Sequence, residues 1–346
     1  KNLVTKFNYL KIDSLKNFSK KQIWKNLSSI LFLFIHLIKQ SIRYKVNLIP
    51  IFSHIVFRFL KYQSMFESNI SKFLINIRPV IKSSIKNYLF KENGGKYTAS
   101  IQKSLNGFGY ADFYYDCDML FSFGTRSFLV NDQMNCNINK VIPVGSLNLE
   151  QYWHKENKIK SAYFDVINLA GNSTNTPDIL KHKEYDDDYY TQFEWMVKIS
   201  KKFPQLTMGI KHHKSLRVHD QKEINLIKNS SIKRIVNDPS DSKNLSYNVG
   251  YSSNFACTWC SIIAYELISL NKPCFFLDPN GRNDSFFQYD RINDFWRIKT
   301  YEDFEKIVKE IVIEKKIIDI KNQNYFCLNS NDVSKKIIKE LNNFKL

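Results

Sequence analysis

Apolar residues recur at intervals of three and four between residues 12 and 90, which is the spacing of amphipathic α-helices. Ile23, Leu27 and Phe34 illustrate this spacing. Beyond Gly94, short apolar runs separated by turn residues replace it. We therefore predict a helical N-terminal region followed by a region in which strands and helices alternate.

Three short segments predict strands in the first half of the chain. Lys96–Ile101 has an extended pattern, and Met119–Phe123 and Val141–Val144 are apolar runs that each end at a glycine. The polar segment Gln151–Lys160 follows, and we interpret it as a linker. These features favour an α/β layer with parallel strands in residues 1–150.

A second series of strands and helices fills residues 161–330. The expected strands are Tyr163–Leu169, Thr207–Lys211, Lys233–Asn237, Asn254–Thr258 and Pro273–Leu277. The expected helices are one with Phe193, Met196, Val197 and Ile199 on one side that ends near Phe203, then Ser261–Leu270 and Tyr301–Glu314. Such alternation is typical of a doubly wound sheet. Residues 331–346 form a last helix, and because the chain starts at Lys1, we expect further sequence upstream.

The net charge is concentrated in the N-terminal region. The formal net charge is +18, and residues 1–90 hold sixteen basic and only two acidic side chains. Such an imbalance favours a partner that is a polyanion, such as anionic lipid, nucleic acid or an acidic acceptor. An AT-rich genome would enrich Lys, Asn and Ile without any functional demand, and this alternative stays open.

The apolar stretches of this region are too short to cross a bilayer. Ile30–Ile38 has nine residues, and Val46–Leu60 is interrupted by Pro50 and Arg58, whereas a span needs about 20 apolar residues. We expect both to be buried elements. The alternative is that one of them lies in a membrane interface between its basic flanks.

The six cysteines suit a reducing compartment and are too few for a disulfide framework. Cys257 and Cys260 form a CxxC pair, but no second Cys or His pair lies near them in the sequence. We therefore expect them to pack in the core rather than to bind zinc, and we predict no metal site.

Candidate chemistry lies in the loops that follow the strands of the second series, because ligands of doubly wound sheets bind beyond the carboxyl ends of strands. These loops contain Gly171-Asn172, His212-His213, Cys260-Ser261 and Asp278–Arg282. Four polar loops at one edge of one sheet predict a ligand site. The alternative for each loop alone is a solvated turn.

Two of these loops favour a nucleotide. Ser261 opens a helix, whose unpaired N–H groups and partial positive charge suit a phosphate, and Glu266 in that helix could accept hydrogen bonds from ribose hydroxyls. Lys211 and His213 could bind a phosphate and neutralise a leaving group. The alternatives are an N-cap serine, a solvated glutamate and a solvated basic loop.

Several acidic residues are weaker candidates. Asp186-Asp187-Asp188 resembles a metal-binding motif, but we place it in the loop that precedes a helix, where acids favour the first turn. Asp116 and Asp118 are candidate general bases. Asp290 and Asp294 are weaker still.

The order of these pieces resembles the GT-B glycosyltransferases, and most of all the bacterial surface-polysaccharide group of sialyl-, polysialyl- and Kdo-transferases and CDP-glycerol glycerophosphotransferases. The matching segments are Ile210–Lys214 (IKHHK), Cys260–Glu266 (CSIIAYE), Asn271–Pro279 (NKPCFFLDP), Val141–Ser146 (VIPVGS) and Ile101–Gly124. The resemblance covers residues 95–325. Lys214 replaces the proline of a His-Pro motif, so His213 is the matching histidine and His212 is an additional one. Lys103 and Cys260 also depart from the pattern of these families.

The resemblance implies an α/β, GT-B-like fold with two Rossmann-like domains facing a cleft. It implies transfer of a sugar, or of glycerol phosphate, from a nucleotide-activated donor of the CMP, CDP or UDP type, with a CMP- or CDP-linked donor favoured, to a surface-glycan or lipid-linked acceptor, as in capsule or lipopolysaccharide synthesis. The implied catalytic residues are His213, Asp116 and Asp118. The implied donor-binding residues are Gly171, Asn172, Lys211, His212, His213, Ser261, Glu266 and Asp278.

No cofactor is expected, because the nucleotide-activated sugar is a substrate. The expected location is the cytoplasm, with peripheral contact to an anionic inner-membrane face, and nucleic acid is not the expected partner. Three alternatives stay open: a nucleic-acid-binding protein, a non-catalytic glycan-binding GT-B module, and a sugar-nucleotide epimerase.

Overall fold

A computed structural model describes residues 20–68, 71–77, 82–103, 114–153, 163–170, 183–212, 221–235, 245–259, 261–281, 294–319 and 323–344. By contact density the chain divides into two compact units. The smaller unit contains Lys1–Ser100, Tyr115–Met119 and Asn137–Asn139, and the larger contains Ile101–Tyr114, Leu120–Cys136 and Lys140–Leu346. These units divide the chain differently from the ranges 1–150, 161–330 and 331–346, which stay a prediction.

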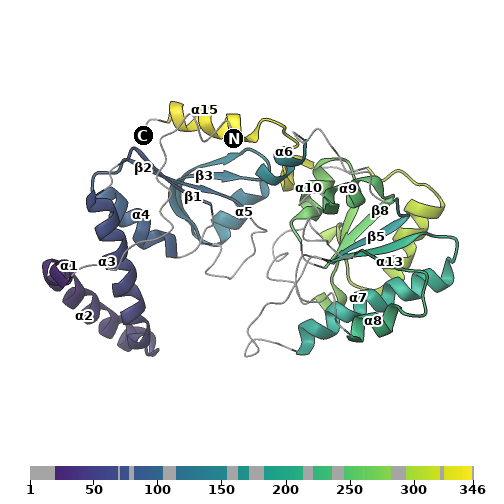
Figure 1. The fold of residues 1–346 in the computed structure, drawn as a ribbon, viewed down its shortest axis with the longest axis horizontal. Coiled ribbons are helices and arrows are strands. Elements are labelled where there is room, and N and C mark those ends of the chain that lie inside the picture. Colours follow the sequence, from purple (N-terminus) through teal and green to yellow (C-terminus); the bar gives the residue numbers. More distant parts are fainter. Residues whose placement is uncertain are drawn as a thin grey trace. The chain divides into compact units, whose positions relative to one another are not determined.

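The first half of the chain combines helices with a four-stranded sheet (Figure 1). The helices are α1 (Lys20–Lys25), α2 (Leu27–Tyr44), α3 (Phe52–Ser68), α4 (Lys82–Glu92) and α5 (Arg126–Gln133), with a short 3-10 turn at Ile49–Ile51. The strands are β1 (Phe73–Asn76), β2 (Tyr97–Ile101), β3 (Asp116–Ser122) and β4 (Asn137–Pro143), in the order β1-β2-β3-β4. The predicted strands β2, β3 and β4 are confirmed within a few residues.

Strand β1 contradicts the prediction that residues 12–90 are helical. Its four residues FLIN are too few to show a period, and the strand exists because it pairs in parallel with β2, with Phe73 opposite Tyr97. A small core of Met65, Phe66, Leu89 and Phe90 packs α3 against α4.

The expectation that Ile30–Ile38 is buried is wrong for much of its length. Leu37 is buried, whereas Leu31, Phe32 and Ile35 are exposed. Among the described residues, helix α2 packs against α1, α3 and the 3-10 turn. The exposed apolar side chains of α2 are accessible to solvent in the part of the chain that the structure describes.

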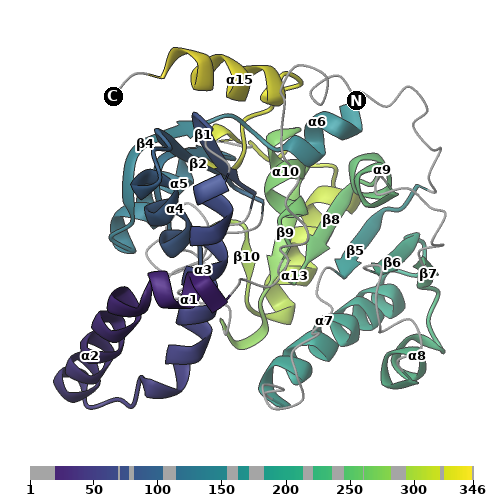
Figure 2. The same cartoon turned by 60° about the vertical axis from the view of Figure 1, so that its left-hand side comes forward.

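The larger unit is built on a six-stranded parallel sheet (Figure 2). Its strands are β5 (Val166–Ala170), β6 (Met208–His212), β7 (Lys233–Ile235), β8 (Phe255–Thr258), β9 (Cys274–Leu277) and β10 (Arg297–Ile298), in the order β10-β9-β8-β5-β6-β7. The chain order reverses between β5 and β8, as in doubly wound sheets. The predicted fold class, α/β with parallel sheets and many helices, is confirmed.

Helices flank this sheet (Figure 1). They are α7 (Lys183–Lys202), α8 (Gln221–Ile227), α9 (Leu245–Ser252), α10 (Ile263–Ser269), α13 (Tyr301–Val308, continued by a π-helical turn, Lys309–Ile313) and α14 (Gln323–Phe326). Phe193, Met196 and Ile199 of α7 are fully buried in the core of this unit, as their spacing predicts. Helices α6 (Leu147–Trp153) and α15 (Val333–Asn343) contact each other, and Glu150 of α6 accepts hydrogen bonds from Ser334 of α15.

Helix α7 starts earlier than predicted, so Asp186-Asp187-Asp188 lies inside it rather than in a loop. Asp188 is fully buried and Asp187 is exposed. The predicted linker overlaps the end of α6, so its first residues are helical, while residues 154–160 lie outside the described residues.

Candidate functional site

The carboxyl ends of β5, β6, β8 and β9, which precede the predicted loops in the sequence, lie at one edge of the six-stranded sheet. Strand β6 ends at His212, β8 ends at Thr258 shortly before Ser261, and β9 ends at Leu277 before Asp278. Gly171, Asn172 and His213 directly follow this edge in the sequence but lie outside the described residues, as do Cys260 and Asp290. The arrangement of this edge is the one that binds ligands in open α/β sheets.

Lys211 and His212 are both buried at the end of β6. The Lys211 Nζ atom donates to the His212 carbonyl oxygen at 2.8 Å, and the His212 Nε2 atom lies 2.7 Å from Glu223 Oε1. Both side chains therefore interact with their own chain, and they fix the backbone immediately before His213.

Glu223 of α8 is the centre of this buried group. It also accepts hydrogen bonds from Arg234 Nε of β7 at 3.1 Å and from the Tyr189 hydroxyl of α7 at 3.2 Å. The extra histidine of the sequence thus has a structural partner: His212 links the end of β6 to α7, α8 and β7 through one carboxylate.

Glu266 is fully buried in α10, and each of its carboxylate oxygens accepts a hydrogen bond. The Ser146 hydroxyl donates to Oε1, and the Tyr247 hydroxyl of α9 donates to Oε2 at 2.8 Å. Burial raises the pKa of Glu266 to about 7, while the two hydrogen bonds act in the opposite direction. Glu266 therefore joins α9, α10 and the segment before α6.

This arrangement restricts the predicted ribose contact. A ribose hydroxyl can reach the Glu266 carboxylate only if Ser146 or Tyr247 moves, because the side chain has no exposed surface. The same move would break one of the two hydrogen bonds that keep the buried carboxylate satisfied.

Ser261 is half-buried and stands two residues before the first residue of α10. Its carbonyl oxygen accepts a hydrogen bond from Ala264 N at 3.2 Å, so it belongs to the first turn. The structure gives the cap of this helix no side-chain hydrogen bond, which leaves the predicted N-cap role without support and the predicted phosphate role untested.

Asp278 is fully buried after β9 and forms an ion pair with Arg297 of β10. Arg297 also donates to the Gly281 carbonyl oxygen at 2.9 Å, and Asp278 N donates to the Ile298 carbonyl oxygen at 2.8 Å. In the structure Asp278 therefore fixes the loop after β9 against the edge strand β10.

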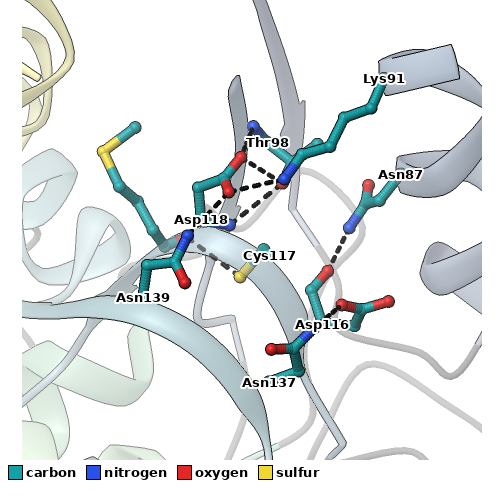
Figure 3. Close-up of polar contacts among 9 residues, drawn as sticks. Asn87, Lys91, Thr98, Asp116, Cys117, Asp118, Asn137 and Asn139 are labelled. Atoms are coloured by element: carbon teal, nitrogen blue, oxygen red, sulfur yellow. Dashed lines mark hydrogen bonds and ion pairs between the residues drawn. The ribbon is translucent and has the colours of Figure 1, made fainter. Parts of the chain in front are cut away.

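The two candidate bases of the smaller unit differ in their surroundings (Figure 3). Asp118 is buried, and its carboxylate accepts hydrogen bonds from Lys91 Nζ at 2.7 Å, Thr98 N at 2.8 Å, Thr98 Oγ1 at 3.0 Å and Asn139 Nδ2 at 3.0 Å. These four bonds hold α4, β2 and β4 around β3.

Asp116 is half-buried and accepts a hydrogen bond at Oδ1 from Asn137 Nδ2 at 2.8 Å. Its carbonyl oxygen accepts from Asn87 Nδ2 (Figure 3). Because Asp116 is more accessible and has fewer described donors than Asp118, it is the better placed of the two to take a proton from a bound hydroxyl.

Asp116 also lines a pocket of the smaller unit. This pocket has a volume of about 830 Å³ and lies among α2, α3 and α4. Its wall includes Phe32, Leu33, Ile55, Phe59 and Ile85. The size falls within the range of small-molecule sites, and the mainly apolar wall suits a hydrocarbon or aromatic group.

Sequence reasoning missed Ser146 and Tyr247 as partners of Glu266, and Tyr189, Glu223 and Arg234 as partners at the end of β6. Ser146 carried a signal, since it ends the VIPVGS segment that the resemblance singled out. The short helices α8 and α9, which supply Glu223 and Tyr247, have no long apolar period that would have predicted them.

The described residues contain no group of three or more His, Cys, Asp or Glu side chains that could hold a metal ion. Cys257 is fully buried in β8, as expected for a core residue. Burial raises the pKa of its thiol well above the ordinary value, which is typical of an inert cysteine.

No family model matches the sequence, and no curated protein sequence is significantly similar to it. Solved structures with the GT-B fold are similar to the chain in three dimensions. A Staphylococcus aureus MnaA–UDP co-structure aligns with a TM-score of 0.53 and 11% identity over 82% of this chain and 79% of that chain.

The UDP-GlcNAc 2-epimerase of Methanocaldococcus jannaschii, solved with UDP-GlcNAc and UDP, aligns with a TM-score of 0.53 and 13% identity over 82% of this chain and 79% of that chain. A protein described as a putative UDP-N-acetylglucosamine 2-epimerase, from Listeria monocytogenes, aligns with a TM-score of 0.53 and 11% identity over 82% and 78% of the two chains. The chain therefore has a GT-B-like fold.

Proposed function

We infer that this protein is an enzyme that acts on a nucleotide-activated sugar bound at the carboxyl edge of the six-stranded sheet. The observation that carries this inference is the convergence of the carboxyl end of β6, the start of α10 and the residues directly after β9 at one edge of a doubly wound sheet. Solved structures of the same fold contain UDP or UDP-GlcNAc by their descriptions, which supports a uridine or related nucleotide here.

In the proposed site, His213, Ser261, Gly171 and Asn172 contact the nucleotide, and buried residues fix the ends of the strands and the helix next to them in the sequence. Lys211, His212 and Glu223 hold the end of β6, Asp278 and Arg297 hold the loop after β9, and Glu266 holds α10. A protonated His213 would neutralise charge on the departing nucleotide phosphate. A direct bond from Glu266 to the ribose belongs to the proposal only together with a movement of Ser146 or Tyr247.

The reaction that we propose is transfer of the sugar, or of glycerol phosphate, to a surface-glycan or lipid-linked acceptor, as in the bacterial polysaccharide transferases that the motifs resemble. The apolar pocket beside Asp116 suits the hydrocarbon part of such an acceptor. Asp116 would then accept the proton of the attacking hydroxyl. Such an acceptor would place the enzyme at the inner face of the membrane.

A second candidate reaction is epimerisation of the sugar while it is still attached to the nucleotide. The similar solved structures favour it, since two of the three are described as UDP-GlcNAc 2-epimerases, one of them as a putative one. An epimerase needs no acceptor, so the fate of the donor separates the two reactions.

NMR analysis of a nucleotide sugar incubated with the enzyme tests this proposal. A transferase releases nucleotide at a rate that rises when a lipid-linked or glycan acceptor is added, and Asp116→Asn lowers that rate by 10²-fold or more. An epimerase converts the donor with no acceptor present. If the donor stays unchanged under both conditions with CMP-, CDP-, UDP- and GDP-sugars, the proposed function is wrong.

A further inference from the structure

Helix α2 presents an exposed apolar stripe, which consists of Leu27, Leu31, Ile35 and Ile42. Their spacings of four, four and seven residues place these side chains on one side of the helix. Leu31 and Ile35 are each 54% exposed and Ile42 is 73% exposed. Leu37 on another side of α2 is buried, and Phe34 packs edge-on against Phe52 of α3, with 5.0 Å between ring centroids. Helix α2 thus packs through Leu37 and through Phe34 at the edge of the stripe, while Leu31, Ile35 and Ile42 stay exposed beside that contact.

The stripe runs into an apolar hairpin tip, which consists of residues 42–51, from the end of α2 through the 3-10 turn before α3. Five large apolar side chains of the tip are exposed: Ile42, Tyr44, Val46, Ile49 and Ile51. The turn is held by its own hydrogen bonds, because Lys45 at φ 53° closes α2 and Leu48 N donates to Ser41 Oγ at 3.0 Å. An ordered turn thus carries a cluster of apolar side chains outward.

Cations accompany this apolar surface. Residues 20–68 hold eight basic side chains and a single acidic one, Glu67, which pairs with Lys25 at 2.9 Å. Arg43 and Lys45 in the tip and Lys39 in α2 are exposed. A protein or second copy with a plain apolar surface would not require this excess of positive charge, whereas the anionic headgroups of a bilayer would be attracted to it.

The length and apolarity of the helices suit an element that lies in the interface of a membrane. No helix among the described residues is long and apolar enough to cross a bilayer. A helix with an apolar side, flanking Lys and Arg and an aromatic residue near the boundary lies in the headgroup region with its apolar side among the acyl chains. Tyr44 beside Arg43 and Lys45 fits this arrangement, since tyrosine is enriched at that depth.

We propose that the stripe and the hairpin tip dock this protein onto an anionic bilayer, with the apolar side chains inserted among the acyl chains and Lys39, Arg43 and Lys45 at the headgroups. This inference stands on the surface of α2 and the tip alone. It needs neither a bound nucleotide nor turnover.

Flotation of the full chain with lipid vesicles tests the proposal. The protein is expected to float with vesicles of phosphatidylcholine mixed with phosphatidylglycerol and to stay behind with pure phosphatidylcholine. Replacing the three exposed cations with glutamine (Lys39→Gln, Arg43→Gln, Lys45→Gln) should weaken binding, by roughly fivefold for each cation. The matched control replaces three exposed lysines of the larger unit, Lys201, Lys228 and Lys299, with glutamine and should bind like the wild type.

A second pair of variants tests the apolar contact. Leu31→Gln with Ile35→Gln should lower the affinity for the anionic vesicles by about tenfold or more, because two apolar side chains no longer enter the acyl region. Both positions are exposed, and glutamine is a good helix former, so circular dichroism should be unchanged. The control replaces two exposed apolar residues of the larger unit, Phe295→Gln and Ile317→Gln.

Two results would overturn the proposal. One is a vesicle result, which is either no binding by the wild type or equal binding by the stripe variant and its control. The other is a wild-type dimer in light scattering that dissociates in the stripe variant, because the stripe would then bind a second copy. Binding of nucleotide, measured on the same samples, reports on the proposed function separately and has no bearing on either result.

Discussion

The Asp118 carboxylate connects three elements of the smaller unit through four hydrogen bonds (Figure 3). We expect Asp118→Asn to lower the free energy of unfolding by about 2–4 kcal/mol, because the new amide group would face donors such as Thr98 N and Lys91 Nζ. Asp116→Asn is the matched control and should cost about 1 kcal/mol or less. Urea unfolding of both variants measures the difference, and equal stabilities would refute the structural role of Asp118.

Glu266 should make stability depend on pH. Its pKa is about 7 in the folded protein and near the ordinary 4.5 in the unfolded chain. Between these values the folded state holds a proton that the unfolded state has lost, so stability falls as the pH rises from 4.5 to 7, by about 3 kcal/mol for this group. The contribution is complete below pH 4.5 and absent above the folded pKa.

Glu266→Gln should remove this pH dependence, since glutamine does not titrate. Urea midpoints measured between pH 5 and 8 for the wild type and the variant would show it. If the urea midpoints of the two proteins changed in parallel with pH, the Glu266 carboxylate would be accessible to solvent, or charged throughout this pH range, in the folded protein.

At the scale of elements, Gly145 fixes the turn between β4 and α6. It has a φ of +100°, and a Cβ atom there would lie 2.7 Å from the Leu328 carbonyl oxygen. Gly145→Ala should therefore destabilise the protein by about 2–4 kcal/mol, through both the backbone conformation and the clash. Thermal unfolding checks this.

Gly281 offers a control at the same scale. It also has a positive φ, of +67°, but a Cβ atom there would meet nothing nearer than 3.5 Å. Gly281→Ala should cost only the backbone term, about 1 kcal/mol. If the two substitutions cost the same, the contact of Gly145 with Leu328 has no energetic weight.

The elements that could be predicted from the sequence are those with enough residues to show a period or a continuous buried run. Strands β5, β8 and β9 consist mainly of apolar residues, β6 is buried along its whole length, and α7 repeats its apolar positions over twenty residues. Strand β1 and helix α8 are too short to show a period, and they form because neighbours cover them. The exposure of the apolar side chains of α2 was not predictable either, because an apolar stretch has the same sequence pattern whether or not other parts of the protein cover it.

The candidate site was likewise predictable only in part. The carboxyl edge of the sheet follows from the order of strands and loops, so Lys211, Ser261 and Asp278 could be placed there. The partners of these residues could not be, because Ser146 meets Glu266 across 120 positions of sequence. A spacing pattern shows which residues share an element, whereas these contacts depend on how elements pack.

At the scale of the whole molecule, the protein has two surfaces with different chemistry. One is the carboxyl edge of the larger sheet, where the nucleotide is proposed to bind. The other is the apolar and basic surface of α2 and the hairpin tip, which is proposed to meet a membrane. Both have their own test, so the failure of one leaves the other standing.

A nucleotide-binding measurement decides whether the carboxyl edge of the six-stranded sheet is a nucleotide site. Thermal unfolding with CMP, CDP, UDP and GDP should show one nucleotide that stabilises the wild type, by about 2.7 kcal/mol at a hundred times its Kd. His213→Ala and Ser261→Ala should reduce that stabilisation, whereas His36→Ala and Ser231→Ala, at exposed positions that are not part of the proposed site, should keep it. No stabilisation by any of the four nucleotides, or equal stabilisation of all four variants, would contradict the proposed site.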